Sequence, residues 1–133
     1  MIKIWIDGSA KPNPGKAGIG IVIRSDNWDY DISEKIDSKD KVSGNQGEYM
    51  ALCRALEELL KNNVKEPVEI FSDSQLLVWQ MTDKISVGRG DEYANEFQRA
   101  KILQRYFNSI CYHYIPREEN AEANILASKA VRS

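Results

Sequence analysis

Along the first third of the chain, apolar and polar residues alternate with the period of two that is typical of β-strands. Residues 2–7 and 28–36 show this pattern and are predicted to be strands, and a further strand is predicted at residues 17–24, which are rich in glycine and isoleucine. A strong turn signal separates the first two, the run of Pro12, Asn13, Pro14 and Gly15. Strands that follow one another through turns are expected to pair as antiparallel hairpins.

From Glu48 onward the apolar spacing becomes that of helices. Helices are expected from Glu48 to Asn62, over residues 74–81, around Tyr93, Phe97, Ala100, Leu103 and Phe107, and over residues 121–131. Short strands are expected at residues 68–72 and 110–115, and polar loops or turns at residues 38–47, 82–91 and 116–119. The order β-β-β-α-β-α-α-β-α predicts an α/β fold, with one mixed sheet covered by helices in a single domain, residues 1–133.

Composition is that of an ordinary globular domain: 133 residues, 42% hydrophobic and 29% charged. No apolar run is long enough to cross a membrane, and no leader is expected before the first strand. Cys53 and Cys111 lie in apolar periodic segments, so we expect buried free thiols and a reducing cytoplasmic location. The net charge of −2 argues against avid non-specific nucleic-acid binding and leaves a local groove open.

Four oxygen-bearing side chains stand where the expected elements begin or end. Asp7 ends the first strand, Asp73 ends the fourth strand, Glu48 begins a helix, and Asn124 lies near the start of the last one. Strand ends meet at one edge of an α/β sheet, so these groups are candidates to converge. Clustered carboxylates repel one another unless a cation lies between them, and Mg²⁺ or Mn²⁺ prefers oxygen ligands.

Each of these residues also has an ordinary structural interpretation. Asp7 suits an Asx turn, Glu48 suits the positive end of a helix, and Asp73 lies in a sequence that caps helices. Asn124 is consistent with a solvent-facing helix position. Only the order and spacing of the four favour chemistry.

The chain resembles the type 1 ribonuclease H family along nearly its whole length. The matching segments are Trp5-Ile6-Asp7-Gly8-Ser9 with Asn13-Pro14-Gly15, Asn45-Gln46-Gly47-Glu48-Tyr49-Met50-Ala51-Leu52, Phe71-Ser72-Asp73-Ser74-Gln75-Leu76, and Ile115-Pro116-Arg117-Glu118 with Asn120 and Ala123-Asn124. The resemblance implies a ribonuclease H-like fold, with a five-stranded mixed sheet of three antiparallel and then two parallel strands.

The resemblance also implies a reaction and a site. Asp7, Glu48, Asp73 and Asn124 correspond to the family's catalytic and metal-binding positions, which hold two Mg²⁺ or Mn²⁺ ions during catalysis. The implied activity is endonucleolytic hydrolysis of the RNA strand of RNA/DNA hybrids, leaving 5′-phosphate and 3′-hydroxyl ends. Double-stranded RNA stays open as a second substrate, and the protein is expected to be a monomer without membrane contact.

Substrate contacts can be carried over in the same way. The resemblance assigns 2′-hydroxyl and phosphate contacts to eight residues: Gly8, Ser9, Ala10, Asn13, Asn45, Gln46, Ser74 and Arg117. Arg117 is equally consistent with a surface arginine paired to Glu118 or Glu119. Trp79, Tyr93, Phe97 and Phe107 are expected in the core, and packing is the favoured role for Trp5.

The sequence departs from the family at several points. Asn124 replaces the usual fourth aspartate, and an amide oxygen is a neutral, weaker metal ligand. Residues 116–120 are too short for the family's histidine-bearing loop, so the only histidine, His113, is expected to be structural. The basic protrusion is also missing, and residues 82–91 offer only Lys84 and Arg89.

Three other functions remain open at this point. Asn124 favours a hybrid-binding module with little or no cleavage, whereas three retained carboxylates favour an enzyme. A related nuclease acting on double-stranded RNA or DNA would share the fold, and competition between duplexes would reveal it. A structural protein with an accidental acidic cluster would not show cooperative stabilisation by Mg²⁺ or Mn²⁺.

Overall fold

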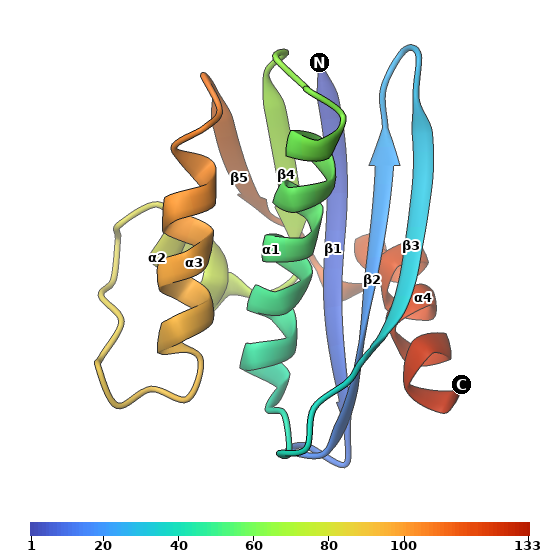
Figure 1. Ribbon diagram of the computed structural model, residues 1–133, viewed down its shortest axis with the longest axis vertical. Coiled ribbons are helices and arrows are strands. Elements are labelled where there is room, and N and C mark those ends of the chain that lie inside the picture. Colours follow the sequence, from blue (N-terminus) through green and yellow to red (C-terminus); the bar gives the residue numbers. More distant parts are fainter.

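A five-stranded sheet with strand order β3-β2-β1-β4-β5 forms the centre of the structure, a computed structural model that describes residues 1–133 (Figure 1). The strands are β1 (Ile2–Lys11), β2 (Lys16–Arg24), β3 (Asp29–Ile36), β4 (Val68–Ser72) and β5 (Ile110–Tyr114). β1, β2 and β3 pair antiparallel, β4 pairs parallel with β1, and β5 pairs parallel with β4. The predicted mixed sheet of three antiparallel and two parallel strands is confirmed.

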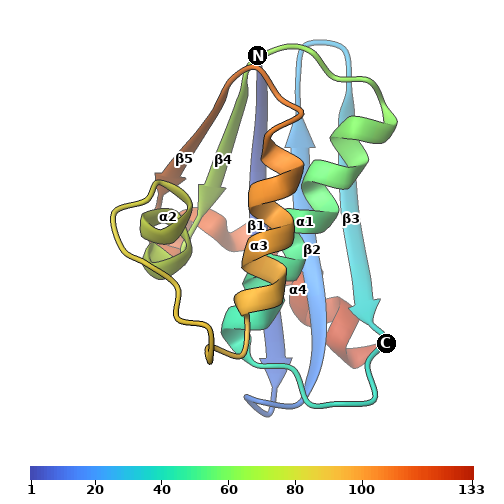
Figure 2. The same ribbon diagram turned by 60° about the vertical axis from the view of Figure 1, so that its left-hand side comes forward.

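Helices cover both faces of this sheet (Figures 1 and 2). They are α1 (Gly44–Lys61), α2 (Gln75–Met81), α3 (Ala94–Gln104), the 3₁₀ helix η1 (Arg117–Asn120) and α4 (Ala121–Arg132). α1 packs on β1 and β2 and has α3 beside it, while α4 packs against β1, β2 and β3 on the other face. Buried Ile4 and Ile6 of β1 meet Leu52 and Leu56 of α1 in the core between them. No helix has the length and apolar character that a membrane span requires.

Two glycines let helix backbones approach the sheet closely. A Cβ atom on Gly8 of β1 would lie 2.2 Å from the carbonyl carbon of Gly47 in α1. A Cβ atom on Gly20 of β2 would lie 2.1 Å from the carbonyl oxygen of Ala123 in α4. Neither glycine has a positive φ, so space and not backbone conformation requires them. These contacts fix the helices that carry Glu48 and Asn124.

Two predicted boundaries are wrong for identifiable reasons. β1 does not end at Asp7 but continues to Lys11, because β2 pairs with it along that length, down to Lys16 opposite Lys11. α1 begins at Gly44, inside the expected loop, because Ser43 and Gln46 form a capping box. The Ser43 hydroxyl accepts from the Gln46 N–H at 3.0 Å, and the Gln46 side-chain oxygen accepts from the Ser43 N–H at 3.1 Å.

Some side chains also differ from expectation. Cys53 is buried as predicted, but Cys111 is exposed, because it lies on the outer edge strand β5. Trp79 is 38% exposed on α2 and is therefore not a core residue.

The other aromatic residues predicted to lie in the core pack inward. Tyr93 is buried and immediately precedes α3, whereas Phe107 lies beyond the end of that helix; Phe97 and Phe107 are partly buried against the core. Trp5 stacks on Phe71 with ring centroids 4.9 Å apart, which confirms a packing role.

Candidate active site

Asp7 and Asp73 lie side by side because of the register between two parallel strands. The ladder between β1 and β4 ends with the pair Ile6 and Ser72, so each aspartate is the residue that follows the last pair. β4 stops there, whereas β1 continues and pairs only with β2, which opens a space between the two strands. Asp7 is buried and Asp73 is half-buried at this point.

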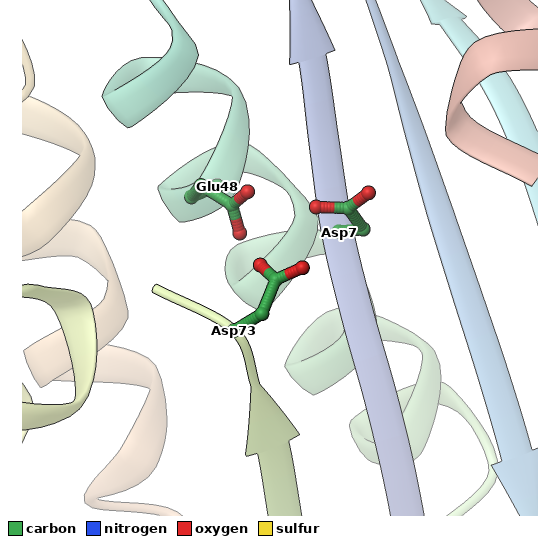
Figure 3. Close-up of side chains that lie close together, drawn as sticks. All are labelled: Asp7, Glu48 and Asp73. Carbon is green, nitrogen blue, oxygen red and sulfur yellow. The ribbon is translucent and has the colours of Figure 1, made fainter. Parts of the chain in front are cut away.

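Glu48 completes a group of three carboxylates at this opening (Figure 3). It lies in the second turn of α1, which the contact between Gly8 and Gly47 holds against β1, so its position does not suit the role of balancing the helix dipole. One carboxylate oxygen of each of Asp7, Glu48 and Asp73 lies within 4.8 Å of the others. The Oε2 atom of Glu48 is buried and has no hydrogen-bond partner.

Burial and neighbouring negative charge raise the pKa values of two members of this group, Glu48 and Asp73. Burial, reinforced by the negative charge of Asp7, raises the pKa of Glu48 well above its usual value. Burial and Asp7 also raise the pKa of Asp73, against the opposing effects of the Asn120 amide and the Arg117 guanidinium. An all-oxygen donor set with an unpartnered buried oxygen fits a hard divalent cation such as Mg²⁺ or Mn²⁺.

The fourth predicted residue lies in the same place. Asn124 comes from the first turn of α4, and its Nδ2 donates a hydrogen bond to Oδ2 of Asp7 at 2.8 Å. Arg117 from η1 is exposed and forms no ion pair with Glu118 or Glu119, contrary to the surface-pair alternative. The acidic group opens into a cavity of about 180 Å³. The residues that line this cavity are Asp7, Gly8, Ser9, Glu48, Asp73, Arg117 and Asn124.

The remaining predicted substrate-contact residues lie around the acidic group, and several of them form hydrogen bonds within the protein. The side chains of Asn13 and Gln46 form hydrogen bonds within the protein. The Oδ1 of Asn13 accepts from the N–H of Gly44 at 2.9 Å, and the side chain of Gln46 caps α1. Both line a polar cavity of about 530 Å³ together with exposed Asn45. Ser74 caps α2, because its hydroxyl accepts from the N–H of Leu77 at 3.2 Å. Ala10 lies in β1 beyond Ser9.

Asn120 belongs to one of the matching sequence segments, but its sequence context predicts no role at the site. It is 1% exposed, and its Nδ2 donates to the backbone carbonyl of Ile6 at 2.9 Å, directly before Asp7. Its amide also lowers the pKa of Asp73. A polar residue directly before an apolar helix was the available signal, but only the fold shows that it connects η1 to β1 next to Asp7. His113, by contrast, stacks on Phe71 in β4, as its predicted structural role requires.

The raised pKa of Glu48 predicts a stability effect. A carboxyl whose pKa is raised by folding contributes most stability below its unfolded pKa, about 4.3, and loses that contribution as the pH rises through the folded pKa. Glu48→Gln should therefore stabilise the cation-free protein at neutral pH by roughly 1–3 kcal/mol and flatten its pH dependence. Chemical denaturation with a chelator between pH 5 and pH 8 tests this. If the substitution left the slope of unfolding free energy against pH unchanged, Glu48 would not be the group whose raised pKa causes this pH dependence.

Comparison with known proteins places this geometry in a family. A family model described as "Reverse transcriptase-like" matches residues 6–130. The crystal structure of LC11-RNase H1 in complex with RNA/DNA hybrid superimposes with a TM-score of 0.88 at 33% identity, covering 99% of this chain and 97% of that chain. The chain belongs to the ribonuclease H-like family. The site described above thus lies in a ribonuclease H-like fold.

Two further relatives show how much of a longer protein this chain matches. The N-terminal RNase H domain of a Mycobacterium tuberculosis protein, solved as a fusion with maltose binding protein, superimposes with a TM-score of 0.87 at 27% identity, covering 98% of both chains. The sequence named "Bifunctional protein" from that organism is 29% identical over 130 residues, 98% of this chain and 35% of the relative. The chain therefore spans about a third of the length of that relative.

Proposed function

We propose that this protein is a metal-dependent endoribonuclease that hydrolyses the RNA strand of RNA/DNA hybrids, leaving 5′-phosphate and 3′-hydroxyl ends. One observation carries the proposal: Asp7, Glu48 and Asp73 converge within 4.8 Å at the end of the β1–β4 ladder, with a buried oxygen of Glu48 unpartnered. A protein 33% identical over nearly the same length has been solved in complex with RNA/DNA hybrid.

Each carboxylate has a defined part in this chemistry. Two Mg²⁺ or Mn²⁺ ions held here would lower the pKa of the attacking water and stabilise the leaving 3′ oxygen of the phosphodiester. Asp7 from β1, Glu48 from α1 and Asp73 from the position directly after β4 point toward one another and together would hold the ions (Figure 3). Asn124 orients Asp7 through its hydrogen bond and is proposed as a weak fourth ligand through its amide oxygen.

Recognition of the hybrid is proposed to use the surfaces on either side of the acidic group. The backbone of Gly8, Ser9 and Ala10, with Asn13 and Asn45, offers donors and acceptors to the 2′-hydroxyl groups that distinguish RNA from DNA. Gln46 and Ser74 cap helices through their side-chain oxygens, and each keeps a donor that capping does not use, the Nε2 of Gln46 and the hydroxyl hydrogen of Ser74. Arg117, exposed and unpaired beside Asp73, suits a backbone phosphate.

The proposal is tested by cleavage of an end-labelled RNA strand annealed to DNA, in Mg²⁺ and Mn²⁺ in parallel. Internal cuts confined to the hybrid and ending in 3′-hydroxyls are expected. All-DNA duplex and double-stranded RNA are the controls for substrate class. Tight binding of the hybrid without cleavage in either metal would favour the binding-module alternative.

The amide at position 124 gives a second expected result. Asn124→Asp replaces a hydrogen bond to Asp7 by a contact between two carboxylates, so the cation-free protein should lose about 1–3 kcal/mol of stability. The added charge should strengthen metal binding, so less Mg²⁺ should be needed for half-maximal cleavage. Titration of the rate with Mg²⁺, beside a denaturation curve in chelator, measures both. An unchanged Mg²⁺ requirement would mean that the amide is already an adequate ligand.

A further inference from the structure

A buried hydrogen bond joins the helix that carries Glu48 to the helix that follows Asp73. Tyr49 comes directly after Glu48 in α1, and Gln80 lies in α2, which begins two residues after Asp73. The hydroxyl of Tyr49 donates to Oε1 of Gln80 at 2.6 Å, and Nε2 of Gln80 donates to the hydroxyl of Tyr93 at 3.0 Å. Tyr49, Gln80 and Tyr93 are called here the buried bridge.

The buried bridge favours one fixed geometry of the two helices. Gln80 is 2% exposed, and a buried amide is tolerated only when its oxygen and nitrogen both have partners. The two tyrosines supply these partners, and their rings stack with centroids 5.4 Å apart and an angle of 10°. α1 and α2 meet at few other points, because most of α1 packs on β1, β2 and α3. The hydrogen bond between Tyr49 and Gln80 is therefore a main connection between α1 and α2.

Asp73 is coupled to α2 by the turn in which it lies. The hydroxyl oxygen of Ser72 accepts from the N–H of Ser74 at 3.0 Å, which closes the backbone across Asp73. The hydroxyl of Ser74 then caps α2 by accepting from the N–H of Leu77 at 3.2 Å. Because this turn has no slack, a shift of α2 away from α1 would change the direction in which Asp73 points.

We propose that Gln80 is a positioning residue for the metal site. Its hydrogen bond with Tyr49 holds α1 and α2 together and thereby sets the separation of Glu48 and Asp73, which point toward each other (Figure 3). This inference rests on the proposed function. Carboxylate oxygens of these two residues and of Asp7 lie within 4.8 Å of one another, and their like charges repel. A rigid connection resists this repulsion and keeps the ligands in place before a cation binds, so less free energy is spent on ordering them.

Two matched substitutions separate positioning from stability. Tyr49→Phe and Tyr93→Phe each remove one hydroxyl from a buried stacked ring, and each leaves one polar atom of Gln80 without a partner. Only Tyr49→Phe breaks the connection between α1 and α2. It should weaken Mn²⁺ binding about tenfold, whereas Tyr93→Phe should bind Mn²⁺ nearly as the parent does. Calorimetric titration with Mn²⁺ in the absence of hybrid measures this, and the Mg²⁺ concentration for half-maximal cleavage should change in the same proportion.

A double variant removes the hydrogen bond with less damage to the core. Tyr49→Phe combined with Gln80→Met places apolar atoms on both sides, and the hydroxyl of Tyr93 keeps its longer contact of 3.5 Å to Oδ2 of Asp91. This variant should be more stable than Tyr49→Phe alone in thermal denaturation with a chelator. Its Mn²⁺ binding should nevertheless stay about tenfold weaker than that of the parent, because α1 and α2 are no longer tied together.

The pattern across these variants decides the inference. Equal Mn²⁺ affinity in Tyr49→Phe and Tyr93→Phe, whether both are weakened or both unchanged, would overturn the positioning role of Gln80. Parental Mn²⁺ affinity in the double variant would overturn it as well. In either case, cleavage of hybrid by the unmodified protein would leave the proposed function standing. An unmodified protein that neither binds Mn²⁺ nor cleaves hybrid would overturn the proposed function and this inference with it.

Discussion

Asp7→Asn should lower the rate of hybrid cleavage by about a thousandfold or more while the protein stays folded. A carboxylate oxygen of Asp7 lies within 4.8 Å of those of Glu48 and Asp73, and a metal-assisted displacement draws several kcal/mol of transition-state stabilisation from its ligands. The substituted amide removes one charge from the group. Its oxygen can still accept the hydrogen bond from Nδ2 of Asn124, so local packing survives. Asp73→Asn should behave in the same way.

Single-turnover cleavage and thermal denaturation in chelator measure the two effects separately. The cation-free variant is expected to be as stable as the parent or slightly more stable, since repulsion among the carboxylates falls. Asp26→Asn makes the same change of charge at an exposed position in the β2–β3 connection and should leave cleavage unaltered. Cleavage by Asp7→Asn at the parent rate would show that the assigned mechanism is wrong.

The sheet was predictable because periodicity alone determines which segments are strands and helices. Residues 2–7 have the alternation of a half-buried strand, residues 68–72 were predicted as a short buried strand, and both are strands. The strand prediction ended the first one at Asp7, whereas pairing with β2 extends it to Lys11. Asp7 is nonetheless at an end, that of the parallel ladder with β4, which explains why the predicted convergence of Asp7 with Asp73 was correct.

Features that depend on contacts across the fold were harder to predict. Asn120 is buried through its bond to the carbonyl of Ile6, more than a hundred residues earlier in the chain, and local sequence carries no trace of that contact. Gln80 likewise looks like an ordinary polar helix position until Tyr49 and Tyr93 are seen on either side of it. Trp79 was placed in the core by its type, but its position on α2 leaves it exposed. Apolar character alone does not say which face of a short helix is covered.

Gly8→Ala should damage both stability and activity, because this glycine sets the distance between two parts of the active site. The added Cβ would lie 2.2 Å from the carbonyl carbon of Gly47 and 2.5 Å from the backbone nitrogen of Glu48, and no rotamer change can move these backbone atoms. Overpacking of this kind costs about 3 kcal/mol or more. If the protein folds, α1 must shift away from β1, which separates Glu48 from Asp7. A displacement of about 1 Å in a catalytic group can cost roughly a hundredfold in rate.

Gly90→Ala is the matched control, since a Cβ there meets nothing within 4 Å and the residue is exposed. Denaturation curves and cleavage rates of the two variants should therefore differ sharply, although both exchange glycine for alanine. Excess Mn²⁺ adds a further distinction, because tighter metal binding can draw Glu48 back toward Asp7 and restore part of the rate in Gly8→Ala. Near-normal stability and cleavage in Gly8→Ala would mean that the close contact with Gly47 is not what positions Glu48, and that the capping box at the start of α1 is sufficient to do so.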